Sequence, residues 1–156
     1  MIRPAGPGDA AAVAEIWHAG WRDGHLGHVP DALADVRTDE SFRVRAAERV
    51  ADTTVAVVDG DVAGFVMVDG DEVEQVYVSA RHRGTGVADG LLREAERQVA
   101  AAGHAEAWLA VVAGNVRARR FYEREGWRDA GPFAYDARVE DGSTVSVPCH
   151  RYVKPL

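Results

Sequence analysis

The segment from Val73 to Leu92, VEQVYVSARHRGTGVADGLL, constrains the fold more than any other part of the chain. Val76 and Val78 at alternate positions predict a β-strand, and a glycine-rich turn follows it. Beyond the turn, apolar residues recur at helical spacing, which predicts a helix that runs to Ala102 and ends at Gly103. The chain therefore contains a strand, a glycine turn and a helix N-terminus in direct succession.

This glycine turn is suited to bind an anion. The first amides of a helix have no intrahelical partner, and the helix dipole adds partial positive charge at this end. Gly84 and Gly86 carry no Cβ atom that would keep a phosphate from these amides. Arg81, His82 and Arg83 place cationic or titratable groups beside them. The turn predicts a ligand that carries phosphate, although two glycines by themselves more often mark only a tight turn.

Two common phosphate-binding loops do not match the spacing. A dinucleotide fingerprint requires G-x-G-x-x-G, but Asp89 holds the position of the third glycine. The acidic residue that would follow the next strand is also missing, because that strand ends at Gly114 and Asn115. A Walker loop requires G-K-[ST], and no lysine lies near the turn. These mismatches disfavour an NAD-type oxidoreductase and a Walker-type phosphate loop.

Two motifs in the chain resemble those of one enzyme family. Arg81, Gly84 and Gly86 match the acyl-CoA-binding pattern Q/R-x-x-G-x-G/A. The segment from Asn115 to Trp127, NVRARRFYEREGW, is similar to the pattern N-x-x-A-x-x-x-Y-x-x-x-G-F, with tryptophan in place of phenylalanine. On these motifs the chain resembles the GCN5-related N-acetyltransferases (the GNAT superfamily), over essentially its whole length.

Length and composition predict one cytoplasmic domain over residues 1–156. A chain of this length can bury a sufficient core without disulfides. One cysteine and scattered histidines predict neither a disulfide framework nor a metal site. The N-terminus does not have the pattern of a signal peptide, and no apolar run reaches membrane-spanning length. The formal charge of −7 opposes nucleic-acid binding and mildly favours cationic partners.

Hydrophobic periodicity predicts two further helices and a set of strands. Asp9 is expected to cap a helix that places Trp17 and Trp21 against the sheet, and a second helix is expected over residues 40–51. The loop from Gly24 to Pro30 is a candidate rim for the acceptor pocket that the family places near this first helix. Strands are expected at residues 2–3, 54–58, 62–68, 72–78 and 108–112, followed by a terminal hairpin at 133–139 and 143–153.

The resemblance implies an α/β fold in which acetyl-CoA binds between two strands. The implied central sheet is mixed, mostly antiparallel and flanked by helices, and its one parallel strand pair is splayed. Backbone groups of Val76 and Val78 would meet the acetyl and pantetheine groups, while Asn115 would contact the pantetheine amides, cap its helix, or do both. The residues expected to bind CoA are Val76, Tyr77, Val78, Arg81, His82, Arg83, Gly84, Thr85, Gly86, Val87, Ala88, Asn115, Ala118 and Tyr122.

Three side chains are candidates for catalysis. Acetyl transfer from a thioester to an amine needs a proton acceptor for the amine and a proton donor for the departing thiolate. Tyr122 matches the family position that protonates the thiolate, although the local pattern alone favours packing within its helix. Glu72 and Glu74 share a strand face, so either is a candidate base. Glu72 better matches the family's glutamate, and a solvated strand start explains the pair equally well.

The predicted function is transfer of an acetyl group from acetyl-CoA to a primary amine, directly within a ternary complex. The two glutamates favour a small cationic amine as acceptor, and a small-molecule or peptide amine is expected, without nucleic acid or membrane as a partner. The resemblance leaves open whether the chain forms a homodimer. An acyl-CoA-binding regulatory module without transfer activity is the alternative, and it would bind CoA without releasing thiol.

Overall fold

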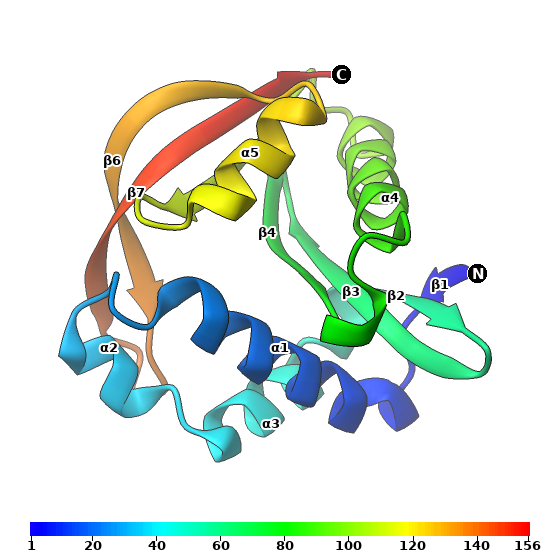
Figure 1. The fold of residues 1–156 in the computed structure, drawn as a ribbon, viewed down its shortest axis with the longest axis horizontal. Coiled ribbons are helices and arrows are strands. Elements are labelled where there is room, and N and C mark those ends of the chain that lie inside the picture. Colours follow the sequence, from blue (N-terminus) through cyan, green and yellow to red (C-terminus); the bar gives the residue numbers. More distant parts are fainter.

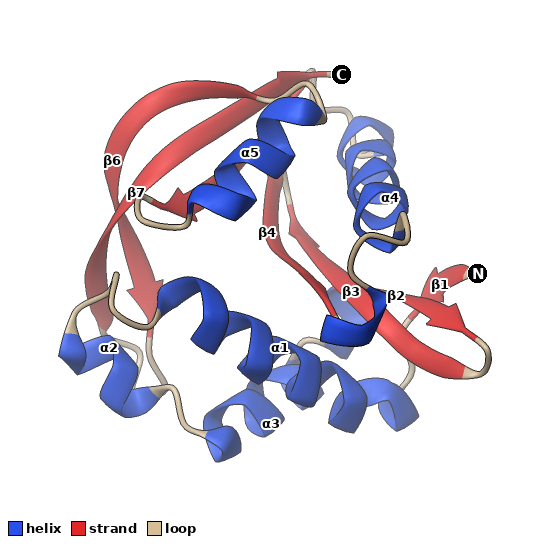
Figure 2. Cartoon of the chain, viewed as in Figure 1, coloured by secondary structure: helices blue, strands red, loops and turns tan.

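The computed structural model describes residues 1–156, whose seven strands form one sheet with helices on both faces (Figures 1 and 2). The strands are β1 (Ile2–Pro4), β2 (Thr53–Val58), β3 (Asp61–Asp69), β4 (Glu72–Val78), β5 (Glu106–Val112), β6 (Arg128–Arg138) and β7 (Thr144–Pro155). The helices are α1 (Ala10–His25), α2 (Asp31–Val36), α3 (Asp39–Glu48), α4 (Val87–Ala101) and α5 (Val116–Arg124), with short 3-10 segments η1 (Pro7–Asp9), η2 (Val50–Asp52) and η3 (Ala80–His82). None of the helices has the length and apolar character needed to cross a lipid bilayer.

The sheet is mixed and mostly antiparallel. Its strands follow the order β1-β2-β3-β4-β5-β7-β6, and β4 and β5 form its one parallel pair. Tight turns produce the β2-β3-β4 meander, since Asp59 and Gly60 adopt positive φ angles of 51° and 84° and so give the turn the twist that hairpins favour. The α/β class and the mixed sheet expected from the sequence are confirmed.

Helices α1 and α3 cover one face of the sheet, and α4 covers the other (Figure 1). Side chains alternate along β3, so that Phe65 and Met67 pack toward α1 and α3 while Val66 packs toward α4. Trp17 on α1 is 1% exposed and meets Phe42 of α3 edge to face, with 5.5 Å between ring centroids. The expectation that Trp17 and Trp21 pack against the sheet is confirmed.

The parallel strands β4 and β5 separate almost at once. Glu72 and Trp108 are the one residue pair in register, and the Trp108 amide donates to the carbonyl of Asp71 at 3.1 Å. In the antiparallel pairing with β3, the amide and carbonyl groups of Gln75 and Tyr77 point toward β3. Those of Val76 and Val78 point to the opposite side of β4, from which β5 has diverged. The splayed strand pair is therefore confirmed.

The N-terminal helices differ from the sequence expectation in two details. Asp9 occupies the N-cap position of α1, as expected, but its carboxylate accepts from Arg3 and from the Gly6 amide and forms no capping hydrogen bond with the helix. Helix α2 was not expected, because its six residues bury only Leu33 and carry no readable periodicity.

The bounds of the two neighbouring segments also change. The second helix ends at Glu48 and gives way to η2, where the Arg49 carbonyl accepts from Thr53. The expected loop begins later than Gly24, because α1 extends to His25.

Candidate active site

A cavity of about 810 Å³ opens where β4 and β5 separate. Residues 72–77 of β4 and 109–112 of β5 line its two sides, and α1, α3, α5 and the β6–β7 hairpin complete it. The cavity brings together the following residues singled out in the sequence: Glu72, Glu74, Val76, Tyr77, Asn115, Ala118 and Tyr122. Val78 and residues 81–88 lie outside its lining, at the end of β4 and the start of α4.

The glycine turn before α4 leaves open space in front of the first helical amides. Gly84 and Gly86 adopt left-handed φ angles of 74° and 88°, which L-residues with a Cβ atom rarely adopt. A Cβ atom at either position would meet no heavy atom within 4 Å, so the turn is not glycine-rich for reasons of internal packing. This geometry fits the approach of a phosphate to the amides at the helix N-terminus.

The basic residues of this turn already have partners within the protein. Arg81 Nη2 lies 3.1 Å from Asp61, and Arg83 Nη2 lies 2.8 Å from Asp23. His82 Nδ1 lies 2.6 Å from the Ser79 hydroxyl. Ion pairs this exposed contribute little to stability, so either arginine can exchange its carboxylate for a ligand phosphate at small cost.

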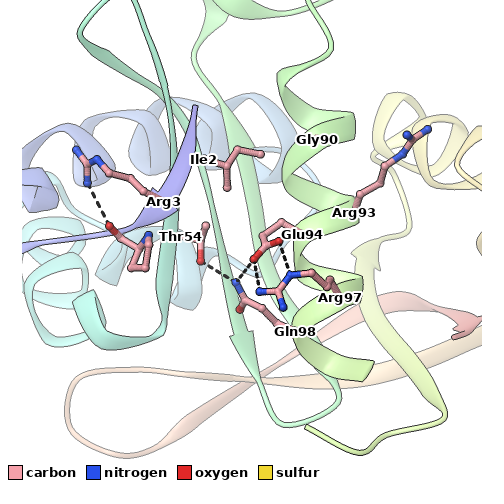
Figure 3. A pocket seen from close by; sticks show the side chains of 9 residues that line it. Ile2, Arg3, Thr54, Gly90, Arg93, Glu94, Arg97 and Gln98 are labelled. Carbon is pink, nitrogen blue, oxygen red and sulfur yellow. Dashed lines mark hydrogen bonds and ion pairs between the residues drawn. The ribbon is translucent and has the colours of Figure 1, made fainter. Parts of the chain in front are cut away.

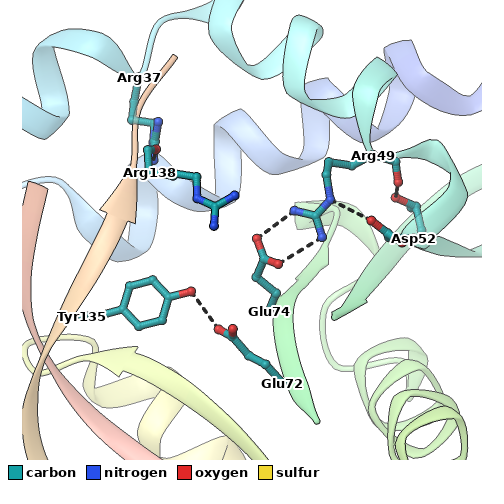
Figure 4. A network of polar contacts seen from close by, with 8 residues as sticks. Arg37, Arg49, Asp52, Glu72, Glu74, Tyr135 and Arg138 are labelled. Carbon is teal, nitrogen blue, oxygen red and sulfur yellow. Dashed lines mark hydrogen bonds and ion pairs between the residues drawn. The ribbon is translucent and has the colours of Figure 1, made fainter. Parts of the chain in front are cut away.

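Glu72 lies at the start of β4 and is the carboxyl group best suited to exchange a proton near neutral pH. Its Oε2 accepts a hydrogen bond of 2.8 Å from the hydroxyl of Tyr135 on β6 (Figure 4). Burial raises the pKa of Glu72 to about 7, against the hydrogen bond from Tyr135, which lowers it. The negative charge of Glu74 contributes to the rise. A carboxyl group with such a pKa is an effective general base.

Glu74 extends from the same side of β4 as Glu72 but meets a different partner (Figure 4). Arg49 donates to both of its carboxylate oxygens, at 2.8 and 3.0 Å, and the Nε of this arginine binds Asp52 at 3.0 Å. A bidentate guanidinium occupies both oxygens of Glu74 and stabilises their negative charge. Both oxygens of Glu74 are therefore engaged by Arg49, whereas Tyr135 engages only Oε2 of Glu72.

Tyr122 on α5 combines packing with an unused hydroxyl group. Its ring packs against Phe121, Trp127 and Tyr152, with centroids 5.2, 6.2 and 6.2 Å away. No group of the protein forms a hydrogen bond with its hydroxyl, and burial raises the pKa of Tyr122 above its ordinary value. The phenol is thus protonated at neutral pH and free to donate toward the cavity that it lines.

The side chains of Asn115 and His25 also line the cavity. Asn115 caps α5, since its Oδ1 accepts from the Ala118 amide at 3.2 Å. His25 stacks on Trp21 at 5.1 Å, and burial lowers its pKa to about 4, so it is neutral at pH 7. His28, from the same predicted rim, packs against Gly114 instead of lining the cavity.

Four polar side chains that contribute to the site were not predicted from the sequence: Arg37, Arg45, Arg49 and Tyr135. The alternation in β6 was a usable signal for Tyr135, since it lies two residues from Phe133 on the inward face of the predicted hairpin. No comparable signal exists for the arginines, because their partners lie on segments distant in the sequence: the Arg138 carbonyl on β6, the Trp17 ring on α1 and the Glu74 carboxylate on β4.

A second, shallower hollow of about 590 Å³ lies between β1 and α4 (Figure 3). Its polar groups are largely paired with each other: Arg97 binds Glu94 at 2.6 Å, and Gln98 donates to Thr54 at 2.9 Å. None of the residues predicted to act in catalysis or binding lines it. The cavity between β4 and β5 is therefore the candidate active site.

The model of the acetyltransferase (GNAT) family matches residues 11–127 of the chain. The chain belongs to the GNAT acetyltransferase family. This GNAT protein is 30% identical over 111 residues to uncharacterized N-acetyltransferases of Mycobacterium tuberculosis and Mycobacterium bovis, a match that covers 65% of its own length and 71% of theirs.

Solved structures of acetyltransferases share its fold. The paiA N-acetyltransferase from Thermoplasma acidophilum, in complex with coenzyme A, superposes with a TM-score of 0.73 at 18% identity, covering 100% of this chain and 98% of that one. The structure of yncA from Salmonella typhimurium with its cofactor acetyl-CoA gives 0.73 at 19% identity, over 100% and 93% of the two chains. A GCN5-related N-acetyltransferase from Rhodopseudomonas palustris gives 0.77 at 20% identity, over 100% and 95%.

Proposed function

We propose that this GNAT protein transfers an acetyl group from acetyl-CoA to a primary amine, directly within a ternary complex and as one domain over residues 1–156. The observation that carries the proposal is a pair of complementary groups in one cavity. Glu72 has a pKa of about 7 and suits proton acceptance, while Tyr122 keeps a free, protonated hydroxyl that suits proton donation. A cytoplasmic location and a homodimer stay predictions from the sequence.

The proposed position of acetyl-CoA follows from the glycine turn and the splayed strands. The open space before α4 suits the pyrophosphate, which Arg81, His82 and Arg83 would flank with Gly84, Thr85, Gly86, Val87 and Ala88 supplying backbone contacts. The unpaired side of β4 at Val76 and Val78 suits the pantetheine amides. The family relatives solved with CoA or acetyl-CoA support this assignment.

The proposed chemistry assigns one proton to each of two residues. Glu72 takes a proton from the acceptor ammonium, directly or through water, which leaves a neutral amine. The nitrogen lone pair then forms a C–N bond with the acetyl carbon while the C–S bond breaks. Tyr122 donates its proton to the departing sulfur, the acylated nitrogen loses its second proton to solvent, and the phenolate takes a proton back from solvent. The N-acetylated product and the CoA thiol then leave.

We assign the base role to Glu72 and a positioning role to Glu74. Arg49 donates hydrogen bonds to both oxygens of Glu74, whereas only one oxygen of Glu72, Oε2, accepts a hydrogen bond from the protein. The charge of Glu74 contributes to the raised pKa of Glu72 and so helps to place it in the range where a base is effective.

A screen of primary amines with acetyl-CoA, followed by free thiol and by the mass of the product, tests the proposal. We expect stoichiometric thiol release and N-acetylation for at least one class of amine, and a strong loss in Glu72→Gln. Calorimetric binding of CoA without thiol release for any amine would instead identify an acyl-CoA-binding regulatory module.

A further inference from the structure

Two arginines in the cavity lack a counter-charge. Arg37, at the end of α2, is 7% exposed and donates one hydrogen bond of 2.7 Å, from Nη2 to the carbonyl of Arg138. Arg45, on α3, is partly buried, and its Cζ lies 4.2 Å from the ring centroid of Trp17. Neither guanidinium forms an ion pair with a carboxylate of the chain, in contrast to Arg49.

Hydrogen-bond donors without partners gather around this part of the cavity. Arg37 Nη1, Arg45 Nη1 and Trp17 Nε1 are buried and form no hydrogen bond within the protein. All three residues line the cavity that contains Glu72. Buried polar groups are usually paired, so three unpaired donors at one site indicate a ligand rich in hydrogen-bond acceptors.

The charges in the interior of the cavity do not balance. The charged lining residues that are not exposed are Arg37, Arg45, Arg49, Glu72 and Glu74. Glu74 neutralises Arg49, and Glu72 is only partly ionised near neutral pH. The remaining lining acids are exposed at the rim: Glu48, Asp52, Asp69, Asp136 and Glu140. The interior therefore keeps an excess of positive charge.

This excess has an energetic cost that a ligand can offset. Burial lowers the pKa of Arg45 to about 10, and the like charge of Arg37 adds to this effect. Burial also lowers the pKa of Arg37, although Glu140 opposes the change from the rim. Guanidinium groups bind carboxylates through paired, charge-assisted hydrogen bonds, and such pairs gain strength away from bulk water.

We propose that the acceptor is an amino carboxylate, a molecule that presents its amine to Glu72 and its carboxylate to Arg37 and Arg45. This inference rests on the proposed acetyl transfer and names the substrate class of the same site. It modifies the small cationic amine expected from the sequence, because the acceptor keeps its ammonium group but gains an anionic group. A free amino acid is the simplest molecule of this kind.

Matched sets of three compounds test the proposal on the unaltered protein. Leucine, methionine and phenylalanine are each compared with the corresponding primary amide and decarboxylated amine, in acetyl transfer and in calorimetric binding to the CoA-loaded protein. We expect kcat/KM for the acids to exceed that for the amides by about tenfold to a hundredfold, mainly through KM. Equal kcat/KM and equal affinity for acids and amides would overturn the proposal.

Variants of α3 show whether an arginine causes the preference. Arg45→Gln should raise KM for the acids at least tenfold and so remove their preference over the amides. Arg43→Gln is the matched control, since Arg43 lies on the same helix, is exposed and pairs with Asp39. Arg45 is preferred over Arg37 for this test because Arg37 also holds the β6–β7 hairpin through Arg138.

The binding measurement separates this proposal from the proposed function. Arg45-dependent binding of an amino acid without any acetylation would support the carboxylate site and overturn acetyl transfer. Acetylation of amines with no preference for acids would support transfer and overturn the carboxylate site. A preference that survives in folded Arg45→Gln and Arg37→Lys variants would also overturn it.

Discussion

The free energy of unfolding should depend on Glu72 in a way that changes with pH. The folded state raises the pKa of this carboxyl from 4.5 to about 7, chiefly by burial. The folded protein therefore holds the proton more tightly than the unfolded chain does. The associated stability is fully present below pH 4.5 and is lost as the pH rises through 7. Glu72→Gln avoids this loss, because glutamine is neutral and can still accept the hydrogen bond from Tyr135.

The size of the effect follows from the size of the pKa change. At about 1.4 kcal/mol per pKa unit, a rise from 4.5 to about 7 corresponds to at most about 3.5 kcal/mol. Glu72 lines an open cavity, so solvent screens part of the penalty and about 1–2 kcal/mol is expected. Such a difference is a large fraction of the stability of an ordinary domain and is easily measured.

Urea unfolding of the parent and of Glu72→Gln at pH 5 and at pH 8.5 provides the assay. The free energy of unfolding of Glu72→Gln relative to that of the parent should rise by about 1–2 kcal/mol from pH 5 to pH 8.5, while the m-values stay equal. Glu48→Gln, which changes an exposed acid at the rim of the same cavity, should show no such growth. A difference between parent and Glu72→Gln that is the same at both pH values would refute the raised pKa.

Two further predictions concern the donor side of the site. Tyr122→Phe keeps the packing of the ring and removes the proton donor, so CoA affinity should be unchanged while kcat for thiol release falls about a hundredfold; a parental kcat would limit Tyr122 to packing. Gly86→Glu projects a carboxylate into the open space before α4 and should weaken CoA binding at least tenfold by calorimetry. Gly103→Glu, at a φ of 96° beyond the opposite end of α4, controls for backbone strain, and an equal loss of CoA affinity there would contradict the phosphate assignment.

The parts of the fold that could be predicted from the sequence depend on neighbouring residues. The strand, turn and helix around Gly84 and Gly86 follow from local alternation, from the need for positive φ angles and from helical spacing. Asn115 could be read as a cap for the same reason, because its partner is the amide of Ala118, three residues away. The short helix α2 was not readable, since one buried residue does not define a period.

The parts of the site that could not be predicted depend on contacts between distant segments. Glu72 and Glu74 could be assigned to one face, but their different roles result from partners 63 and 25 residues away, Tyr135 and Arg49. The missing capping hydrogen bond of Asp9 has the same cause, because an arginine on β1 binds its carboxylate. Arginines are usually exposed, so nothing in the local sequence distinguishes buried Arg37 from its exposed neighbours.

The central claim is that Glu72 is the general base and that Tyr135 and Glu74 set its pKa in opposite directions. The hydrogen bond from Tyr135 lowers this pKa and the charge of Glu74 raises it, so removing one group should have the opposite effect to removing the other. In Glu72→Gln, the rise of kcat/KM with pH that reflects ionisation of Glu72 should be absent. These effects are separable from the titration of the substrate when one acceptor amine is used throughout.

The most direct test is the pH dependence of kcat/KM in the parent, Tyr135→Phe and Glu74→Gln. In the parent, kcat/KM should rise with pH along an acidic limb centred at about 7. The limb should move to higher pH in Tyr135→Phe and to lower pH in Glu74→Gln. An acidic limb that stays in place in both folded variants, or that moves in the same direction in both, would contradict the assignment of Glu72 as the base.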